Sequence, residues 1–172
     1  MSSLPVPVFV YYLQQLEHLL ARIEEQSNYK NGILYARLDT SQDESMFPLV
    51  QQARTAISFS LRACCPLAEL ETVNFAQSEV TFTAVKQEIR DSIEFLEQIP
   101  LHRFQDYEQR SITTTAGFAE LEMKGEEFLQ MYALPNFFFH ITMVYAIARQ
   151  RGITLGKGDF DGLHRYPPGF TF

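Results

Sequence analysis

The sequence predicts an all-α fold, an antiparallel four-helix bundle with one β-hairpin inserted before its last helix. Four segments repeat apolar residues every three or four positions, as helices with one buried face do. One further segment alternates apolar and polar residues, as paired strands do. Long helices joined in this order pack into a bundle, and a length of 172 residues favours a single domain over 1–172.

The first helix is predicted over about 5–26, where Pro5 suits the first turn. Its apolar face consists of Phe9, Leu13, Leu16, Leu20 and Ile23. The connection 27–45 that follows is long for a compact domain, and long connections are often functional. The middle of this connection, Ile33 to Leu38, is an apolar patch in which Arg37 is the one basic residue. A surface or ion-paired role is favoured for this side chain over an anion anchor.

The second helix is predicted over about 47–64. Ser45 is a candidate cap and Pro48 suits the first turn. Pro66 is expected to end the helix, because proline is common just beyond a helix end. The buried face consists of Leu49, Ala53, Ala56, Ile57 and Leu61.

A third helix is predicted over about 79–98, with Ser78 as a plausible cap and Pro100 as a stop. The pattern then changes to a two-residue repeat over about 110–124, with the turn at Ala116–Gly117, which predicts a β-hairpin. A lone hairpin is only marginally stable. We therefore expect it to lie on the helices or to pair across a dimer.

The fourth helix is predicted over about 126–151, with a kink or break at Pro135, because proline removes a backbone hydrogen bond and clashes with the preceding turn. Gly152 is expected to end it. The tail 153–172 is rich in glycine and proline, so no regular structure is predicted there. Its aromatic residues indicate that it docks on the bundle.

Composition excludes several function classes. The formal net charge is −7 and the basic residues form no cluster, which argues against binding to nucleic acid and to an anionic membrane surface. No run reaches the roughly 18 apolar residues of a membrane span, and no secretory signal is recognised. The two cysteines are the adjacent pair Cys64–Cys65, too few for a disulfide framework. We expect two reduced thiols and a cytoplasmic protein.

The common catalytic and ligand motifs are not met. "GITLGK" at 152–157 has three residues between its glycines, whereas a phosphate loop has four and follows a strand. No His-x-x-x-His or Gly-x-Ser-x-Gly pattern is present. His18, His102 and His164 have no partner in the sequence and are expected at the surface or at a cap. No catalytic residue is therefore assigned, although His140 is the best candidate.

Asn136 and His140 lie four residues apart in the apolar segment "ALPNFFFHITMVY", a spacing that places both on one helix face. The rest of that face is apolar, so it should point into the bundle. A buried polar group without a partner costs about 1–3 kcal/mol. Two interpretations remain open. In the first, hydrogen bonds within the protein satisfy both side chains: a carbonyl or a glutamine pairs with His140, and carbonyls that Pro135 frees pair with Asn136. In the second, both residues line a pocket that binds a ligand or metal.

Three stretches resemble the DinB-like superfamily: "MFPLVQQ" at 46–52, "ALPNFFFH" at 133–140 and "GITLGKGDF" at 152–160. The resemblance covers nearly the whole chain and points to a branch that is a domain of unknown function. It implies a four-helix bundle that is often dimeric. Many members of the superfamily are regarded as metalloenzymes.

The resemblance also implies where the metal ligands of that superfamily fall in this chain. In typical members, one histidine of the second helix and two histidines of a His-x-x-x-His in the fourth helix bind a divalent metal. The matching positions are Gln52, Asn136 and His140. Amide oxygens are poor ligands for zinc or nickel beside imidazole. We expect a ligand-binding set with a degenerate metal site and no cofactor beyond a weakly held divalent ion.

Three functions follow as hypotheses. The first is a bundle that binds a small molecule in a pocket between the second and fourth helices. The second, implied by the resemblance, is a metal- or thiol-dependent transferase or isomerase in which His140 acts as ligand or base. The third is a purely structural homodimeric module. The 15 phenylalanines, the hairpin and the resemblance all favour a homodimer.

Overall fold

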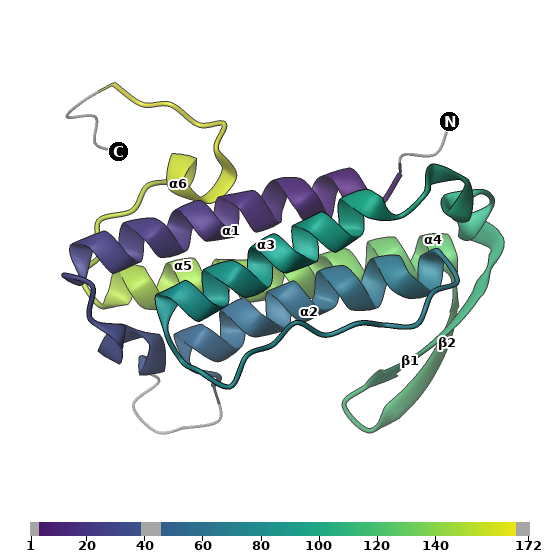
Figure 1. Cartoon of the computed structure of the whole chain (residues 1–172), viewed down its shortest axis with the longest axis horizontal. Coiled ribbons are helices and arrows are strands. Elements are labelled where there is room, and N and C mark those ends of the chain that lie inside the picture. The colour runs from purple at the N-terminus through teal and green to yellow at the C-terminus, as the bar shows by residue number, and fades with distance from the viewer. Residues whose placement is uncertain (1–3, 39–45, 168–172) are drawn as a thin grey trace.

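Four long helices form the bundle in the computed structural model, which describes residues 4–38 and 46–167 (Figure 1). The long helices are α1 (Val6–Gln26), α2 (Leu49–Leu67), α3 (Phe82–Gln98) and α5 (Leu134–Gln150). A short helix α4 (Gly125–Glu127) and a π-helical segment (Phe128–Ala133) lead directly into α5. The remaining elements are β1 (Ser111–Ala116), β2 (Ala119–Lys124), α6 (Lys157–Asp161), and 3-10 turns at Asn31–Tyr35, Leu101–Phe104 and Tyr107–Gln109.

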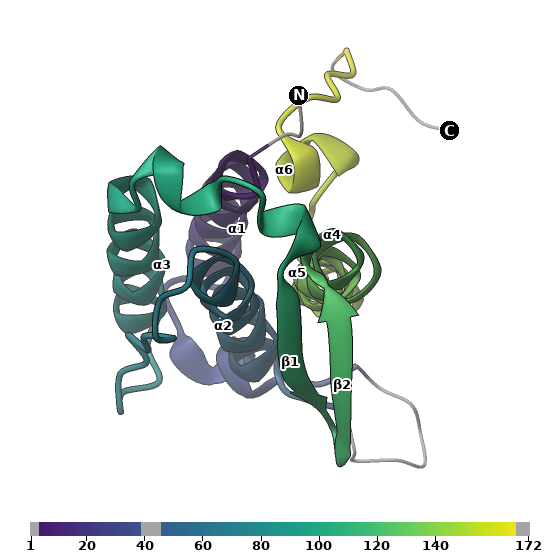
Figure 2. The same ribbon diagram turned by 90° about the vertical axis from the view of Figure 1, so that its right-hand side faces the viewer.

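Helix α1 packs chiefly against α3, and α2 against α5, and each of these pairs is antiparallel (Figures 1 and 2). Helices α2 and α3 run in the same direction, because the extended segment 68–81 returns along the bundle before α3 begins. A buried ion pair fixes this parallel pair. Arg54 of α2 donates to the carboxylate of Glu88 in α3 at 2.7 Å and to the carbonyl of Glu79 at 2.6 Å.

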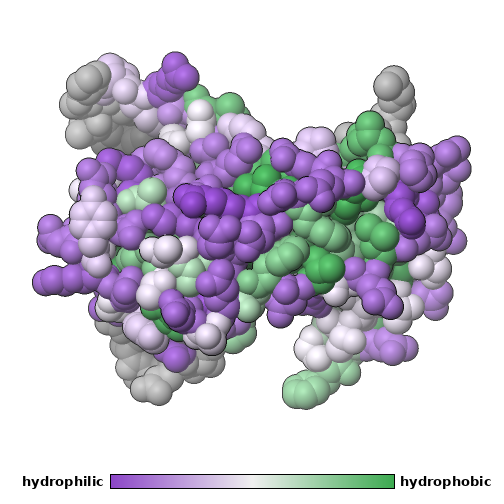
Figure 3. Space-filling model, in the orientation of Figure 1, coloured by the Kyte–Doolittle hydropathy of each residue, from purple (hydrophilic) through white to green (hydrophobic). Residues whose placement is uncertain are grey.

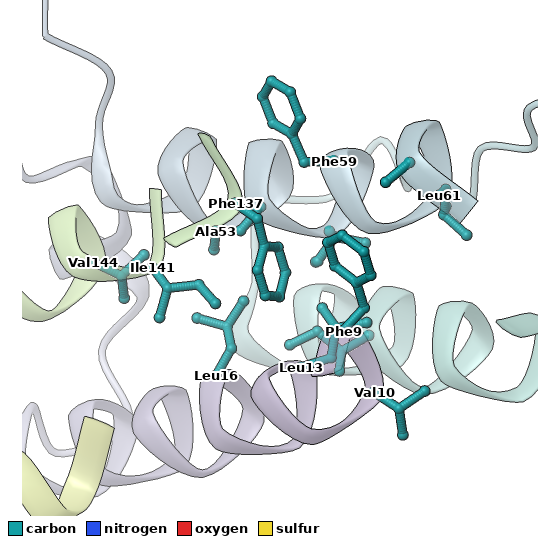
Figure 4. Close-up of a cluster of buried hydrophobic side chains, with 14 of the residues drawn as sticks. Phe9, Val10, Leu13, Leu16, Ala53, Phe59, Leu61, Phe137, Ile141 and Val144 are labelled. Atoms are coloured by element: carbon teal, nitrogen blue, oxygen red, sulfur yellow. The ribbon is translucent and has the colours of Figure 1, made fainter. Parts of the chain in front are cut away.

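The centre of the core lies between α1, α2 and α5 (Figure 4). Phe9 and Phe137 meet there edge to face, with ring centroids 4.9 Å apart. Leu13 and Leu16 of α1 and Ile141 of α5 surround them, all fully buried. Phe59 of α2 points away from this centre, toward the site described below.

The hairpin projects from one end of the bundle (Figures 1 and 2). Its strands pair antiparallel, with Ile112 opposite Met123 and Thr114 opposite Leu121. Ile112 is buried, whereas Phe118 at the tip is fully exposed. The carbonyl of Thr115 accepts hydrogen bonds from Arg62 and Tyr132, which tie the hairpin to α2 and to the π-helical segment.

Pro135 does not interrupt the fourth helical run. The π-helical segment Phe128–Ala133 stands directly before it, where the sequence predicts a kink or break. Proline cannot donate to the carbonyl four residues earlier. The wider turn absorbs this missing bond, as π-bulges inside helices do.

Two other helix boundaries differ from the sequence-based ones. Helix α2 continues through Pro66 and ends one residue later, at Leu67. Helix α3 begins at Phe82 with Thr81 as its cap, whose hydroxyl accepts from the N–H of Ala84. The predicted cap Ser78 precedes that turn, and the other predicted cap, Ser45, lies outside the described residues.

The tail contains regular structure that its composition did not predict. In α6 the carboxylate of Asp159 accepts from the N–H of Gly156 at 2.7 Å and so caps the first turn. Gly162 ends the helix at a φ of 69°, a left-handed conformation that favours glycine. The described part of the tail contacts α1, since Tyr11 donates to the carbonyl of Asp161 at 2.8 Å.

Within the described residues, one helical run, Gly125–Gln150, is long and apolar enough to cross a membrane by length and composition alone. In its most apolar window, 44% of the residues are buried inside the bundle. Core helices of soluble proteins meet the same criterion. The molecule therefore has the build of a soluble domain with one apolar helix.

Candidate functional site

Gln52 and His140 meet between α2 and α5. Oε1 of Gln52 lies 2.6 Å from Nδ1 of His140. Both side chains are buried, with 1% and 9% of their surface exposed. Gln52 lies in the first turn of α2. His140 lies well inside the helical run that begins with α4 and continues through α5. The antiparallel packing of α2 against this run brings the two residues together.

The amide orientation of Gln52 decides which nitrogen of His140 carries the proton. Nε2 of Gln52 donates to the carbonyl of Phe47 at 3.4 Å, which leaves Oε1 as the atom that faces the imidazole. An amide oxygen can only accept, so Nδ1 of His140 is the donor. In the neutral ring, Nε2 of His140 then carries the lone pair.

Aromatic rings surround the imidazole. Phe47 and Phe59 lie nearly parallel to it, with centroids at 6.4 Å and 5.7 Å. Phe139 meets it edge-on at 5.2 Å. Burial among these groups lowers the pKa of His140 below its ordinary value of 6.5, because an apolar environment disfavours the charged form. His140 is therefore neutral at pH 7.

A pocket of about 160 Å³ opens at this point, lined by Met46, Phe47, Gln52, Phe139 and His140. No hydrogen bond is formed by Nε2 of His140 within the part of the chain that the structure describes, and no buried side-chain nitrogen or oxygen there lacks a partner. His140 itself lines the pocket and is 9% exposed. The pocket combines apolar walls with one open acceptor.

Asn136 is on the same helix, one turn before His140, but it is not among the residues that line the pocket. Its side chain is half-buried and donates to the carbonyl of Tyr132 at 2.7 Å. The structure thus brings together two of the three predicted site residues, Gln52 and His140. The amide of Asn136 is directed to the backbone of its own helix.

The donor set does not fit a tightly bound zinc or nickel ion. It offers one imidazole and two neutral amides, and no group of three or more His, Cys, Asp or Glu side chains suited to a metal occurs among the described residues. Zinc sites in proteins use imidazole, thiolate and carboxylate ligands. Nδ1 of His140 is also held by Gln52. We therefore assign no chemistry to a metal here.

The other candidate residues lie outside this pocket. His18 is near Asp159 at 3.6 Å, His102 is exposed, and His164 is hydrogen bonded to the carboxylate of Asp161. Arg37 donates to the carbonyl of Met46 at 2.7 Å, beside the pocket. Cys64 and Cys65 are free and buried. Burial raises the pKa of both thiols, which makes them poor nucleophiles.

A larger hollow of about 510 Å³ lies along the first half of α1, between Val6, Val10, Tyr11 and Glu97. The hydroxyl of Tyr11 already donates to the backbone of the tail. This hollow has no buried polar group with an open bonding position. Size alone does not identify a binding site, so the smaller pocket at His140 is the stronger candidate.

Sequence reasoning missed the apolar walls of the pocket. On the sequence alone, Phe47 is placed at the start of a helix, and Met46 and Phe139 appear only within the stretches that resemble the superfamily. Phe59 gave no signal, because it falls outside the apolar stripe of its helix. The one signal that could have identified Phe139 is its position directly before His140, which the helix pattern places on an inward face.

Comparisons with known proteins agree with this architecture. The family model described as "Domain of unknown function (DUF1993)" matches residues 1–161. A solved structure of a DinB family member protein from Shewanella denitrificans is 27% identical, with a TM-score of 0.79, over 94% of this chain and 92% of that one. No curated protein matches the chain.

Proposed function

The chain belongs to the DUF1993 family and is a DinB-like four-helix bundle, and from this premise we propose that it binds a small molecule in the pocket between α2 and α5. The observation that carries the proposal is the state of His140. Gln52 fixes the proton on Nδ1, burial keeps the ring neutral, and Nε2 presents a lone pair at the pocket.

The pocket selects for a ligand with an apolar body and one hydrogen-bond donor. Nε2 of His140 accepts from a hydroxyl, thiol or N–H group. The rings of Phe47 and Phe139, which lie beside the imidazole and line the pocket, provide apolar contact for the rest of the ligand. In this arrangement His140 contacts the ligand and Gln52 is a positioning residue. Asn136 acts only on the local helix.

The size of the pocket limits the ligand. Drug-sized ligands occupy pockets of roughly 300–1,000 Å³, and this pocket measures about 160 Å³. A single aromatic ring or a short aliphatic chain with one polar head fits such a volume. A larger ligand would have to extend beyond Phe47 and Phe139, which are 45% and 52% exposed.

Phenol is a suitable probe because it has one ring and one hydroxyl donor, and toluene is the matched compound without the donor. We expect phenol to shift the NMR signals of the His140 ring and of Phe139, and to do so more strongly than toluene. His140→Phe should remove the preference for phenol while preserving the apolar walls. His102→Phe, at an exposed position, is the matched control.

Equal shifts by phenol and toluene would contradict the role of His140 as acceptor. An absence of shifts with both compounds up to millimolar concentration would contradict the pocket itself and favour the structural module. Retention of the phenol preference in His140→Phe would place binding elsewhere.

A thiol-dependent transferase or isomerase is the second candidate, favoured by the same oriented and neutral imidazole. Nε2 would take the proton from the S–H group of a bound thiol, which leaves a thiolate and an imidazolium whose Nδ1–H stays bonded to Gln52. The thiol must come from a substrate, because both cysteines of the chain are buried. A fall of the thiol pKa on binding to the native protein, absent in His140→Phe, distinguishes this function from simple binding.

The proposed setting is the cytoplasm, and the proposed unit is one domain over 1–172. Two free and buried cysteines are compatible with a reducing compartment.

A further inference from the structure

Among the described residues, the hairpin is a sheet of only two strands, and it stands out from the bundle as a separate projection (Figure 3). Such a sheet has two outer edges. Along each edge, every second residue turns its N–H and C=O groups away from the paired strand. An edge that stays open offers these groups to a further strand.

The register shows which residues of the hairpin face outward. The N–H of Gly125 donates to the carbonyl of Arg110 at 2.9 Å, so these two residues form a hydrogen-bonded pair. Bonded and non-bonded pairs alternate along an antiparallel ladder. The pair Thr115–Glu120 is therefore non-bonded, and Glu122, two positions further on, has the same orientation. The backbone N–H and C=O groups of these residues point away from the paired strand.

The bundle covers the edge of β1. The carbonyl of Thr115, which points outward from the ladder, accepts hydrogen bonds from Arg62 at 3.5 Å and from Tyr132 at 3.2 Å. This contact agrees with the orientation that the register gives. It also turns β1 toward the helices, so β2 forms the outer edge of the hairpin.

The edge of β2 is open. Glu120 and Glu122 are exposed, and within the part of the chain that the structure describes their backbone N–H and C=O groups form no hydrogen bond. Their side chains lie on one face of the strand, because residues two apart do so. Leu121 and Met123 lie on the other face, together with the buried Ile112. The edge is thus acidic on one face and apolar on the other.

The surroundings of this edge are acidic. Residues 106–127, which contain the hairpin and both of its junctions, carry six acidic and two basic side chains. One of the basic residues, Arg110, is turned to the backbone, where it donates to the carbonyls of Arg103 and Gln105 at 2.8 Å. The other is Lys124, which ends β2. A predominantly basic segment is the electrostatic complement of this edge.

A hollow of about 270 Å³ lies beside the last residues of β2. It is lined by Ser111, Glu122, Met123, Lys124 and Glu127. The first residues of an antiparallel third strand would lie at this end of β2, and the hollow leaves room there for a side chain of that strand.

We propose that β2 binds an extended segment of a partner protein as a third, antiparallel strand of the hairpin. Residues directly opposite each other in a sheet share a face. The segment therefore carries basic residues opposite Glu120 and Glu122, an acidic residue opposite Lys124, and apolar residues between them. Because the strands run antiparallel, the order along the segment is acidic, apolar, basic, apolar, basic.

The charges of the edge disfavour a second copy of β2 as the occupant. If all three edge residues of two antiparallel copies paired, Glu122 of one copy would face Glu122 of the other. Like charges directly opposite each other destabilise a sheet. A third strand with the opposite charges removes this repulsion, and a sheet of three strands is more stable than a lone hairpin.

A fluorescent peptide with the core Glu-Val-Lys-Val-Lys tests the proposal on the native chain by fluorescence anisotropy. N-methylation of both lysines removes the N–H groups that would face β2, whereas N-methylation of both valines removes N–H groups that would point away. We expect the first change to weaken binding by at least about tenfold, because two backbone hydrogen bonds are lost, and the second by less than about threefold.

A charge exchange tests the pairing of side chains. Glu120→Lys combined with Glu122→Lys should weaken binding of the same peptide by about tenfold. A peptide with the core Glu-Val-Glu-Val-Glu should bind this double variant better than it binds the native protein. Glu94→Lys combined with Glu97→Lys makes the same change in net charge at exposed positions of α3. That control should bind the first peptide within about twofold of the native protein at physiological salt.

Amide hydrogen exchange locates the bound peptide. The N–H groups of Glu120 and Glu122 should exchange rapidly in the free protein and slowly when the peptide is saturating. The N–H of Leu121 faces β1 and should be protected in both states. Protection that appears on another element instead would place the peptide elsewhere and overturn the proposal.

Three further results would overturn the proposal. No binding up to millimolar peptide would leave the charges of β2 as a guard against pairing. Equal effects of the two N-methylations would show attraction between charges without strand pairing. Slow exchange at Glu120 and Glu122 in the free, concentrated protein would assign the edge to a second copy. The inference does not depend on the pocket, so phenol binding at His140 is a separate result.

Discussion

Gln52 and His140 are 88 positions apart in the sequence, and their side chains lie 2.6 Å from each other. The contact gives the imidazole a fixed tautomer, because the amide of Gln52 is itself bonded to the carbonyl of Phe47. One glutamine thereby decides which nitrogen of the buried histidine is presented to the pocket. The predictions below begin from this pair.

A negative charge at position 52 should raise the pKa of His140. In Gln52→Glu the carboxylate replaces the amide oxygen beside Nδ1, and it stabilises the protonated ring. An NMR titration of the His140 ring signals measures the change. Gln51→Glu adds the same charge at the exposed neighbouring position and should leave the pKa of His140 close to its native value. Equal behaviour of the two variants would mean that residue 52 does not contact the imidazole in solution.

The stability of the protein should fall as the pH falls through 6.5. The folded state lowers the pKa of His140 below 6.5, so between these two pKa values the unfolded chain binds more protons. The contribution is fully present above pH 6.5 and is lost as the pH drops toward the folded-state pKa. Urea unfolding at pH 7.5, 6.5 and 5.5 measures it. His140→Gln should show a smaller loss over the same range, and an identical loss would assign it to other groups.

The frame of the site should accept a metal once its ligands are changed. Gln52→His combined with Asn136→His would place three imidazoles on the adjoining turns of α2 and α5, a ligand set that zinc prefers. We expect about one zinc per chain in the dialysed double variant and far less in the native protein, by elemental analysis without a histidine tag. About one zinc per native chain, lost in His140→Ala, would contradict the argument from ligand chemistry.

The ion pair between Arg54 and Glu88 should be costly to break. Glu88 is almost fully buried, and Arg54→Met leaves its carboxylate without that partner. We expect a loss of about 3–5 kcal/mol in the free energy of unfolding. Arg90→Met breaks a pair with Glu17 of the same length, 2.7 Å, at an exposed position, and should cost below about 1 kcal/mol. Urea unfolding compares the two, and similar losses would show that burial does not govern the cost.

A methyl group at Gly125 should disturb the junction between the hairpin and α4. A Cβ atom there would lie 1.9 Å from the carbonyl oxygen of Tyr107, a backbone atom that cannot move aside without shifting its turn. We expect Gly125→Ala to cost at least about 1–3 kcal/mol. Gly32→Ala is the control, because nothing lies within 4 Å of its Cβ position. Equal thermal stability of both variants would contradict the close approach.

The sequence by itself determined the class of the fold and the positions of the main elements. The apolar period of three or four marks the faces that α1, α2, α3 and α5 bury, and the two-residue period marks the hairpin, because these periods follow from local backbone geometry. The same local reasoning placed His140 on an inward face. It failed at Pro66, where the helix runs one residue past the proline, and in the tail, where a carboxylate caps a further short helix.

Only the tertiary structure decided what the site is. The resemblance matched Gln52 to a metal ligand of the superfamily, but the structure shows its amide holding Nδ1 of His140. Asn136 shares the helix face of His140, yet its amide is bonded to the carbonyl of Tyr132. Hydrogen bonds between distant segments depend on the angles and distances at which helices pack, and periodicity along one chain carries no information about those.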